Sequence, residues 1–580
     1  METNAYICDM YLQFNEKKGK NGKVYHSVLL CEKYRENGAV KTRVVMNLSK
    51  LPPEITTALK TVINKTKGKL IDSNDIKINQ SFDYGYAFTV LEMMNRLRIN
   101  ETIEKAYRGR ANLIKLMIVG KVLTRGSKLH IFNWIKRNKF IADKLSVDTK
   151  NLKLEDLYFE LGEFSRMQGI VEKKWNIYHK SRHQDIYLYD ITSTYFEGSQ
   201  NELSAFGYNR DGKKGKMQVT IGLITDSQGF PLKIQVFEGN VNDYKTVNEQ
   251  LLTIRRSFNA EQIILVGDRG MRIRLNLEEL DKEEKQGIYY VSALSNSEIR
   301  ALIRDGVIQL SFFSKELVEM EDSGTRYILS NNPQLEQEKR QVRDNLKQRF
   351  EHGILLIKEA WQKRKNQNIE NQEKINNGHK NKKLVTTFTE KKIDGFKYRA
   401  NELLKRYKMS KFYTVEINCD EFTINFSMEE YQKQRALDGK YIIESTVPKE
   451  LMDTKEARQK YKELQNVEHA FRDIKTDKLD VRPVFHRKAD QTRGHVFICM
   501  FAYAIVKEME TAIYAWLKIY NAKNKCKLSY ADIVDELKNI KMSEMELGYR
   551  VKKFMMPNLT QVQQEIIKIL KLKPEAMIKV

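Results

Sequence analysis

Two aspartates lie where a carboxylate can do chemistry. Asp190 stands inside an otherwise apolar strand, and Asp268 follows the apolar run Ile263–Gly267 directly. A buried carboxylate costs on the order of several kcal/mol unless it is paired or binds a metal ion. Sites in open α/β sheets form at the carboxyl ends of parallel strands. Each aspartate alone can equally be a turn or capping residue, but two of them on neighbouring strands favour a metal site.

A third carboxylate, Glu468, lies in a predicted helix after Thr454. At about 100° per residue, one face of this helix spans roughly 80° and carries Tyr461, Leu464, Glu468, Arg472 and Lys475. An adjoining apolar stripe, suited to packing on a sheet, consists of Val467, Ala470, Phe471 and Ile474. We therefore expect Glu468 to point along the sheet toward the aspartates. The alternative is an ordinary charged stripe that faces solvent.

The elements that must position these residues alternate regularly between residues 181 and 295. Apolar and alternating segments predict three strands, then helix, strand, helix and strand, at Asp185–Ile191, Lys216–Thr225, Pro231–Glu238, Asp243–Phe258, Gln262–Val266, Arg272–Gln286 and Ile288–Leu294. A turn of hairpin length, Asp226–Gly229, joins the second and third strands. A three-strand antiparallel meander continued by parallel strands is the layout of the ribonuclease-H-like fold. The predicted class is therefore α/β, a mixed sheet flanked by helices.

A mixed insertion domain, residues 296–446, interrupts this layout. It contains a long charged helix at Gln334–Lys365 and strands near Tyr413–Ile417 and Glu421–Phe426. The low-complexity stretch Asn366–Lys383 is a solvated loop, a frayed helix or a segment that tracks DNA. The core resumes at residues 447–510 with the glutamate helix, and we expect residues 511–580 to be helical.

The N-terminal third has two predicted parts. Residues 1–80 contain a basic three-strand meander, with strands at Ala5–Leu12, Val24–Tyr34 and Ala39–Leu48. Residues 81–180 have helical periodicity, clearest at Thr89–Leu97, Leu113–Leu123 and Leu157–Phe164. We expect the meander to bind DNA and the helical part to serve DNA binding or dimerisation. The alternative is that they are ordinary packing domains.

Composition narrows the functional classes. Lys and Arg number 101 against 76 Asp and Glu, a formal net charge of +25, which indicates either a nucleic-acid partner or biased codon supply. The five cysteines lack paired short spacing, so neither a zinc ribbon nor a disulfide framework is expected, and a reducing cytoplasm fits best. The apolar run Val496–Val506 is too short to cross a bilayer. No phosphate-binding G-x-x-x-x-G-K-[ST] motif is present.

The acidic residues and their surroundings resemble the DDE transposases of bacterial insertion sequences. Asp190-Ile191-Thr192 and Asp268-Arg269-Gly270-Met271 are similar to the two aspartate motifs, and Tyr461-x2-Leu464-x3-Glu468-x6-Lys475 is similar to the Tyr–Arg–Glu–Lys signature of the branch with a long insertion before the glutamate. Arg482-Pro483-Val484-Phe485-His486 and Arg493-Gly494-His495 also look like family segments. One departure is Leu464, which stands where the signature has arginine.

The resemblance implies a metal-dependent enzyme that cuts element ends and joins them to target DNA. Asp190, Asp268 and Glu468 are the expected catalytic residues and hold two Mg²⁺ ions, which Mn²⁺ can replace. In this arrangement Asp190 bridges both ions. The expected partners are double-stranded DNA, namely terminal inverted repeats and target, and a second copy of the chain in the synaptic complex. The expected location is the prokaryotic cytoplasm, at the nucleoid.

Further basic and aromatic residues are predicted to contact DNA. They are Tyr461, Lys475, Arg472, Arg269, Lys213, Lys216, Arg482 and His486. Loop lysines are often merely solvated, and His486 can be structural instead. Two alternatives to a transposase remain open at this point: a domesticated protein that binds DNA without cutting it, and a nuclease of the same fold that does not transpose.

Overall fold

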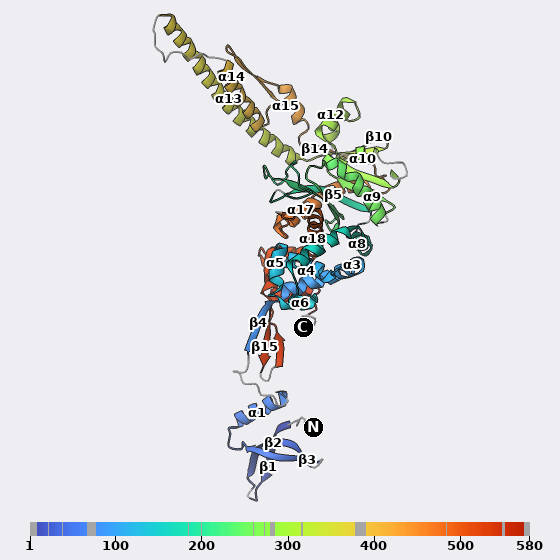
Figure 1. Ribbon diagram of the computed structural model, residues 1–580, viewed down its shortest axis with the longest axis vertical. Coiled ribbons are helices and arrows are strands. Elements are labelled where there is room, and N and C mark those ends of the chain that lie inside the picture. Colours follow the sequence, from blue (N-terminus) through green and yellow to red (C-terminus); the bar gives the residue numbers. More distant parts are fainter. Residues whose placement is uncertain are drawn as a thin grey trace. The chain divides into compact units, whose positions relative to one another are not determined.

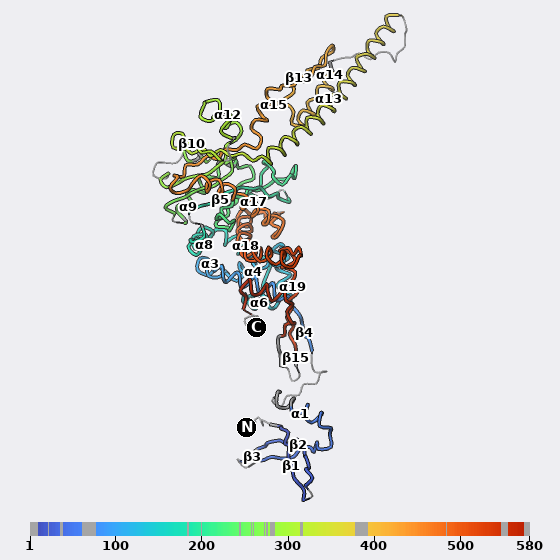
Figure 2. Tube along the Cα trace, turned by 180° about the vertical axis from the view of Figure 1, so that it is seen from behind, coloured from blue at the N-terminus to red at the C-terminus, as the bar shows by residue number. Residues whose placement is uncertain are grey.

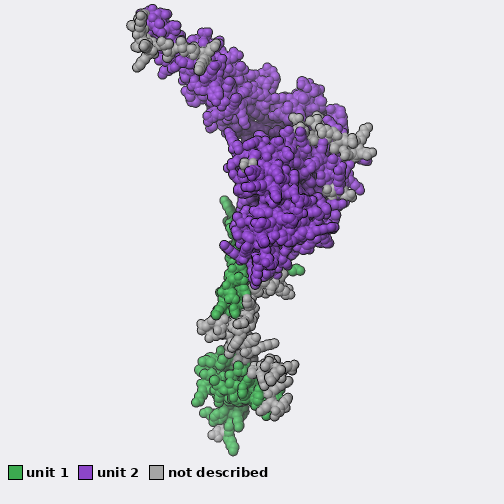
Figure 3. Space-filling view, in the orientation of Figure 1, with its two compact units in different colours: residues 1–92, 512–580 green, residues 93–511 purple. Residues whose placement is uncertain are grey.

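The computed structural model describes the chain apart from residues 1–8, 21, 37–38, 67–76, 184, 199, 259, 272, 279–284, 315–316, 378–389, 483, 548–550 and 574–580. Two compact units divide the chain (Figure 3). One comprises Met1–Glu92 with Ala512–Val580, and the other is Met93–Thr511.

A mixed eight-stranded sheet forms the centre of the unit Met93–Thr511 (Figure 1), in the order β10-β11-β14-β9-β8-β5-β6-β7. Its ribonuclease-H-like strands are β5 (Ile186–Tyr195), β6 (Gln218–Thr225), β7 (Pro231–Glu238), β8 (Ile263–Gly267) and β9 (Ile288–Ala293). The first three are antiparallel neighbours, whereas β5, β8 and β9 run parallel to one another. Strands β6 and β8 are wholly buried, as expected for strands covered on both faces. The predicted strand order is confirmed.

Helices cover both faces of this sheet. On one face, the Tyr189 hydroxyl donates a 2.8 Å hydrogen bond to Thr246 in the turn η2 (Asp243–Thr246), just before α9 (Val247–Phe258). Because side chains alternate along a strand, Asp190 and Thr192 lie on the opposite face. There Lys475 donates to the Thr192 hydroxyl at 2.9 Å. That face is covered by α16 (Thr454–Glu463) and α17 (Gln465–Arg472).

The insertion contributes to the central sheet and also forms a core of its own. Three of its strands extend the sheet beyond β9, namely β14 (Lys440–Ser445), β11 (Thr325–Asn331) and β10 (Leu317–Asp322). The helix α12 (Asn296–Arg304) packs beside them through Ile299, in one cluster with Tyr327 and Ile442.

The second core of the insertion is built by α13 (Pro333–Asn376), α14 (Glu390–Arg406), the hairpin of β12 (Tyr413–Ile417) and β13 (Phe422–Phe426), and α15 (Met428–Arg435). Helices α13 and α14 run side by side in both views (Figure 2). The low-complexity stretch is helical as far as Asn376, and much of its remainder lies outside the described residues.

Helices dominate residues 85–183, as predicted. They are α2 (Gly85–Arg96), α3 (Ile99–Ala106), α4 (Ala111–Thr124), α5 (Lys128–Ile135), α6 (Lys139–Lys144), α7 (Leu154–Arg166) and α8 (Gln168–His183). The long helix α18 (Ala489–Asn524) packs against α7, with the rings of Phe164 and Phe497 stacked at 4.8 Å. Close approach of the two backbones explains Gly494, since a Cβ there would lie 2.1 Å from the carbonyl oxygen of Leu161.

The other unit contains the N-terminal meander, β1 (Asp9–Lys18), β2 (Val24–Glu36) and β3 (Ala39–Asn47), followed by α1 (Pro53–Thr66). The start of the first predicted strand, residues 5–8, lies outside the described residues. This unit also contains a second three-stranded sheet, in which β15 (Lys541–Leu547) pairs with both β16 (Val551–Met555) and β4 (Lys77–Asp83).

The expectation that residues 511–580 are helical throughout is therefore wrong for β15 and β16. Helices α19 (Tyr530–Asn539) and α20 (Gln561–Ile569) flank this hairpin. The partner strand β4 is more than 450 residues away in sequence, since Lys541 pairs with Asp83, and local periodicity contains no signal of so remote a pairing. The remaining domain boundaries stay predictions. Within the described part of the chain, none of the helices combines the length and apolar character needed to span a membrane.

Candidate active site

Asp190 and Asp268 occupy matching positions on neighbouring parallel strands. The register pairs Leu188 with Val266 and Tyr189 with Gly267, so Asp190 and Asp268 come next on β5 and immediately after β8. Adjacent strands lie about 4.8 Å apart. The expectation that these two strands are neighbours is confirmed. Asp190 is half-buried within its strand, whereas Asp268 is exposed beyond the end of β8.

The negative charge of Glu468 affects the carboxyl group of Asp190. The pKa of Asp190 is raised to about 7, first by burial and then by the negative charges of Glu468 and Asp268; the backbone N–H of Ile191 and the cation of Arg210 partly offset this. Glu468 and Asp268 thus place negative charge around Asp190, and the three carboxylates form a locus of negative charge. Such a locus attracts cations.

Glu468 reaches this locus because α17 packs on the sheet through its apolar stripe. Val467, Ala470, Phe471 and Ile474 are all buried, and α17 contacts β5 and β6. The start of α17 is fastened by Asn466, whose side-chain amide donates 2.8 Å to the carbonyl of Ser227 in the β6–β7 turn. Glu468 itself is exposed, so its carboxylate is accessible from solvent. The predicted packing of the stripe is confirmed.

The prediction of one continuous helical face from Tyr461 to Lys475 is wrong. The α-helix is interrupted at Leu464, a buried residue between α16 and α17 whose N–H donates to the Tyr461 carbonyl. After Arg472 the backbone widens into a π-helical turn, Asp473–Asp477. Since π-turns shift the side chains that follow them, Lys475 does not share an α-helical face with Glu468.

Tyr461 and Arg269, two of the predicted DNA-contacting residues, lie near the acidic residues. Burial raises the pKa of Tyr461, the negative charges of Asp268 and Glu468 raise it further, and the cation of Arg269 lowers it. The Tyr461 hydroxyl is therefore neutral at physiological pH and can donate a hydrogen bond. Arg269 is exposed directly after Asp268.

Lys475 and Arg482 meet at a buried carboxylate, Asp211. The Lys475 ammonium lies 2.7 Å, and the Arg482 guanidinium 2.8 Å, from the same Asp211 oxygen. The Asp211 side chain is only 2% exposed. Lys475 also donates to Thr192 on β5. These two cations are thus held in an ion-pair network on the same face of the sheet as Asp190.

Asp211 and its neighbour Arg210 were not singled out from the sequence. They lie in the polar, glycine-containing loop between β5 and β6, where an aspartate reads as a turn residue. The loop is fixed by the backbone N–H of Arg210, which donates 2.9 Å to Ser193 on β5. The only signal available in the sequence was the position of this loop, directly after the strand of Asp190.

The remaining predicted DNA-contacting residues have mixed surroundings. Lys213 is exposed with its ammonium 5.8 Å from the Tyr195 ring centroid, and Lys216 pairs with Glu197 at 2.7 Å. Arg472 is exposed at the end of α17. His486 is not among the acidic residues: its ring packs 5.0 Å from that of His495, and burial together with Lys128 and Lys121 lowers its pKa to about 3.

The chemistry of the three carboxylates suits a hard divalent cation, because Mg²⁺ and Mn²⁺ prefer oxygen ligands. In the described part of the chain, no three acidic, histidine or cysteine side chains are already gathered closely enough to hold an ion. Asp190, Asp268 and Glu468 are the residues that would hold such an ion.

Two transposase family models match parts of this chain. The family described as transposase DDE domain matches residues 181–505, and the IS1634 family transposase N-terminal domain matches residues 12–73. No curated protein matches the chain. Among solved structures, a piggyBac transposase synaptic complex with hairpin DNA is similar at 10% identity and a TM-score of 0.30, over 78% of this chain and 69% of that one. So low a score supports no inference.

The first family match spans more than half of the 580 residues and includes Asp190, Asp268 and Glu468. The second covers most of the N-terminal meander. Nothing in these findings favours a protein that does not transpose. The chain belongs to the DDE transposase family of insertion sequences.

Proposed function

We propose that Asp190, Asp268 and Glu468 together form the active site of this transposase. The observation that supports it is the parallel register of β5 and β8, which places Asp190 and Asp268 at adjacent positions, together with the packing of α17, the helix of Glu468, on β5 and β6. The raised pKa of Asp190, to which the charges of Glu468 and Asp268 contribute, agrees with this geometry. The site would cleave DNA at the ends of its element and transfer the freed 3′-OH ends into target DNA. Two divalent ions, Mg²⁺ or Mn²⁺, would polarise the attacking oxygen and relieve charge on the leaving oxygen.

The residues of the chain have separate roles in this proposal. The three carboxylates hold the ions, and the Tyr461 hydroxyl and Arg269 face the DNA strand as donor and cation. Lys475 and Arg482 act through Asp211, because both are committed to that carboxylate. They position the strand β5, on the face of the sheet that α17 covers, rather than contact the scissile phosphate. The exposed Lys213, Lys216 and Arg472 contact DNA phosphates.

The partner is double-stranded DNA, and we propose that two copies of the chain act together, because two element ends must be joined. Mass measurement by light scattering tests this: paired end DNA should yield a complex with two chains, and a complex with one chain would contradict it. The protein would work at the nucleoid of a prokaryotic cell.

Cleavage of end-labelled element-end DNA in Mg²⁺ tests the site. Asp268→Ala should bind DNA like wild type but cleave it far more slowly. Loss of a residue that only supports a metal ligand lowers activity roughly 10- to 100-fold, and loss of a ligand itself should lower cleavage by more than this. The matched control is Asp322→Ala, an exposed aspartate at the end of β10, which should cleave normally. Equal cleavage by Asp268→Ala and wild type would remove Asp268 from the site.

The nuclease alternative is tested in the same reaction by adding plasmid target. A transposase joins the labelled end to the plasmid, so labelled DNA of plasmid size should appear. Complete cleavage without any joined product would favour a nuclease.

A further inference from the structure

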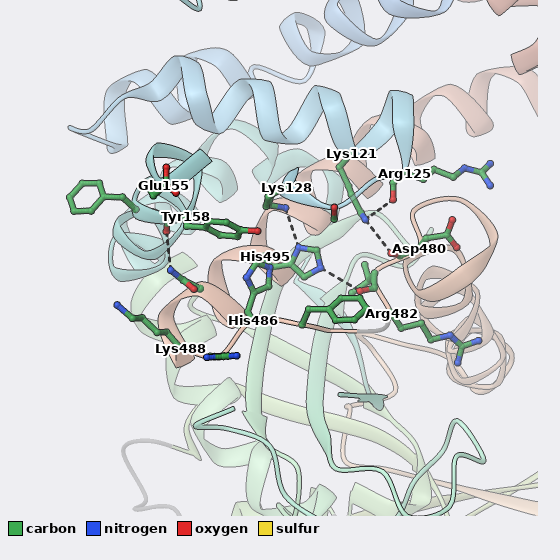
Figure 4. A pocket seen from close by; sticks show the side chains of 16 residues that line it. Lys121, Arg125, Lys128, Glu155, Tyr158, Asp480, Arg482, His486, Lys488 and His495 are labelled. Atoms are coloured by element: carbon green, nitrogen blue, oxygen red, sulfur yellow. Dashed lines mark hydrogen bonds between the residues drawn. The ribbon is translucent and has the colours of Figure 1, made fainter. Parts of the chain in front are cut away.

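A basic cavity of about 730 Å³ opens in the helical part of the unit Met93–Thr511 (Figure 4). Its walls come from α4, α5 and α7, from the segment after the π-turn, and from the start of α18. Glu155 and Asp480 are its two acidic residues. Six lysines and arginines outnumber them, namely Lys121, Arg125, Lys128, Arg482, Arg487 and Lys488.

Lys128 is the unusual member of this set. Its side chain is 2% exposed, and its ammonium lies 3.1 Å from His495 Nδ1. Within the described residues it forms no ion pair with a carboxylate. Burial lowers its pKa to about 8, so it remains a cation at neutral pH. Lys121, in contrast, is satisfied by the backbone carbonyls of Arg125, Gly126 and Asp480.

The groups around Lys128 do not neutralise it. Burial raises the pKa of the Cys499 thiol, which is therefore uncharged at neutral pH. His495 Nε2 lies 3.4 Å from the Val481 carbonyl, so donation there leaves Nδ1 as the acceptor for Lys128. Burial also keeps His495 and His486 neutral by lowering their pKa values. A buried cation of this kind is stabilised when an anion joins it.

We propose that this cavity binds a backbone phosphate of DNA, with Lys128 as its buried counter-charge. The proposal rests on the proposed function for its substrate, DNA, and adds a contact outside the carboxylate site. Arg487 and Lys488, both exposed at the cavity, contact the neighbouring phosphates. The ring of Phe485, 64% exposed, offers a base a stacking surface.

The cavity is linked to the acidic residues through one side chain. Arg482 lines the cavity and pairs with Asp211, which Lys475 connects to Thr192 on β5.

The salt dependence of DNA binding tests the proposal. The full chain is titrated with a labelled mixed-sequence duplex of about 30 base pairs, without divalent metal, between about 50 and 200 mM salt. Loss of one phosphate contact should lower the slope of log K against log salt by about 0.9. Lys128→Met should show this loss while its melting temperature equals or exceeds that of wild type. The control Lys150→Met, at an exposed lysine outside the cavity, should have a slope of log K against log salt closer to that of wild type than Lys128→Met has.

A second variant keeps the test decisive if Lys128→Met fails to fold. Arg487→Gln with Lys488→Gln, at exposed positions, should lower the slope by about 1.8; an unchanged slope would overturn the proposal. A folded Lys128→Met with the wild-type slope would also overturn it, whatever the double variant does. Because no metal is present, failure of cleavage elsewhere leaves this result intact.

Discussion

Lys475 donates a 2.9 Å hydrogen bond to the hydroxyl of Thr192, two residues along β5 from Asp190. The same ammonium pairs with Asp211, which also holds Arg482. The π-turn that contains Lys475 is thereby fastened to the strand of Asp190 and to the loop after it. This network supports the position of the first aspartate from the face of the sheet that α17 covers.

Asp211→Asn should destabilise this unit by about 3 kcal/mol, since it leaves two partly buried cations without their carboxylate. Urea unfolding followed by tryptophan fluorescence measures the change. The control Asp305→Asn breaks an exposed ion pair with Arg304 and should have no measurable effect. Equal unfolding midpoints for Asp211→Asn and wild type would contradict the structural role given to this network.

Gly494→Ala should destabilise the packing of α7 on α18 by about 1–3 kcal/mol. The added Cβ would lie 2.1 Å from the Leu161 carbonyl oxygen, and backbone cannot yield as a flexible side chain does. Thermal melting measures the effect. Gly162→Ala on α7 is the matched control: its Cβ would meet only the Asp490 Cβ at 3.8 Å, so stability should hold or rise. Equal melting temperatures for both variants would refute the close approach.

Lys128 should make stability depend on pH. Its pKa is about 8 in the folded chain against an ordinary 10.5, so the unfolded chain binds more protons between these values. Stability therefore rises as pH increases from about 8 to 10.5, by up to about 3 kcal/mol. Lys128→Met should lack this rise. Lys121 and Cys499 titrate in wild type and in Lys128→Met alike, so the difference in stability between these two proteins at each pH reports on Lys128. If the stability of both proteins changed with pH in the same way, the burial of Lys128 as a cation would be contradicted.

Much of the core could be predicted because its signals are local. Apolar strands and one amphipathic stripe indicated the strand order and the packing of Val467 and Phe471. The neighbouring positions of Asp190 and Asp268 followed from the parallel order of two strands. These features depend on the pattern of a few consecutive residues.

The rest depends on contacts between remote segments. Strand β15 was not predicted because its polar sequence alone does not indicate a strand. It forms by pairing with the remote strand β4. The break at Leu464 and the π-turn at Lys475 occur where the helix packs on the sheet. Helical periodicity in the sequence contains no information about this packing. Asp211 acquires its role only through two cations, Lys475 and Arg482, that lie 264 and 271 residues later in the sequence.

Binding of Mn²⁺, followed by electron paramagnetic resonance with element-end DNA present, tests the central claim most directly. Asp190→Asn, Asp268→Asn and Glu468→Gln should each lose at least one of two bound ions, while Glu463→Gln, whose carboxylate pairs with Lys460 at 3.1 Å, should keep both. If any of the three variants binds Mn²⁺ as wild type does, the carboxylates do not share one metal site.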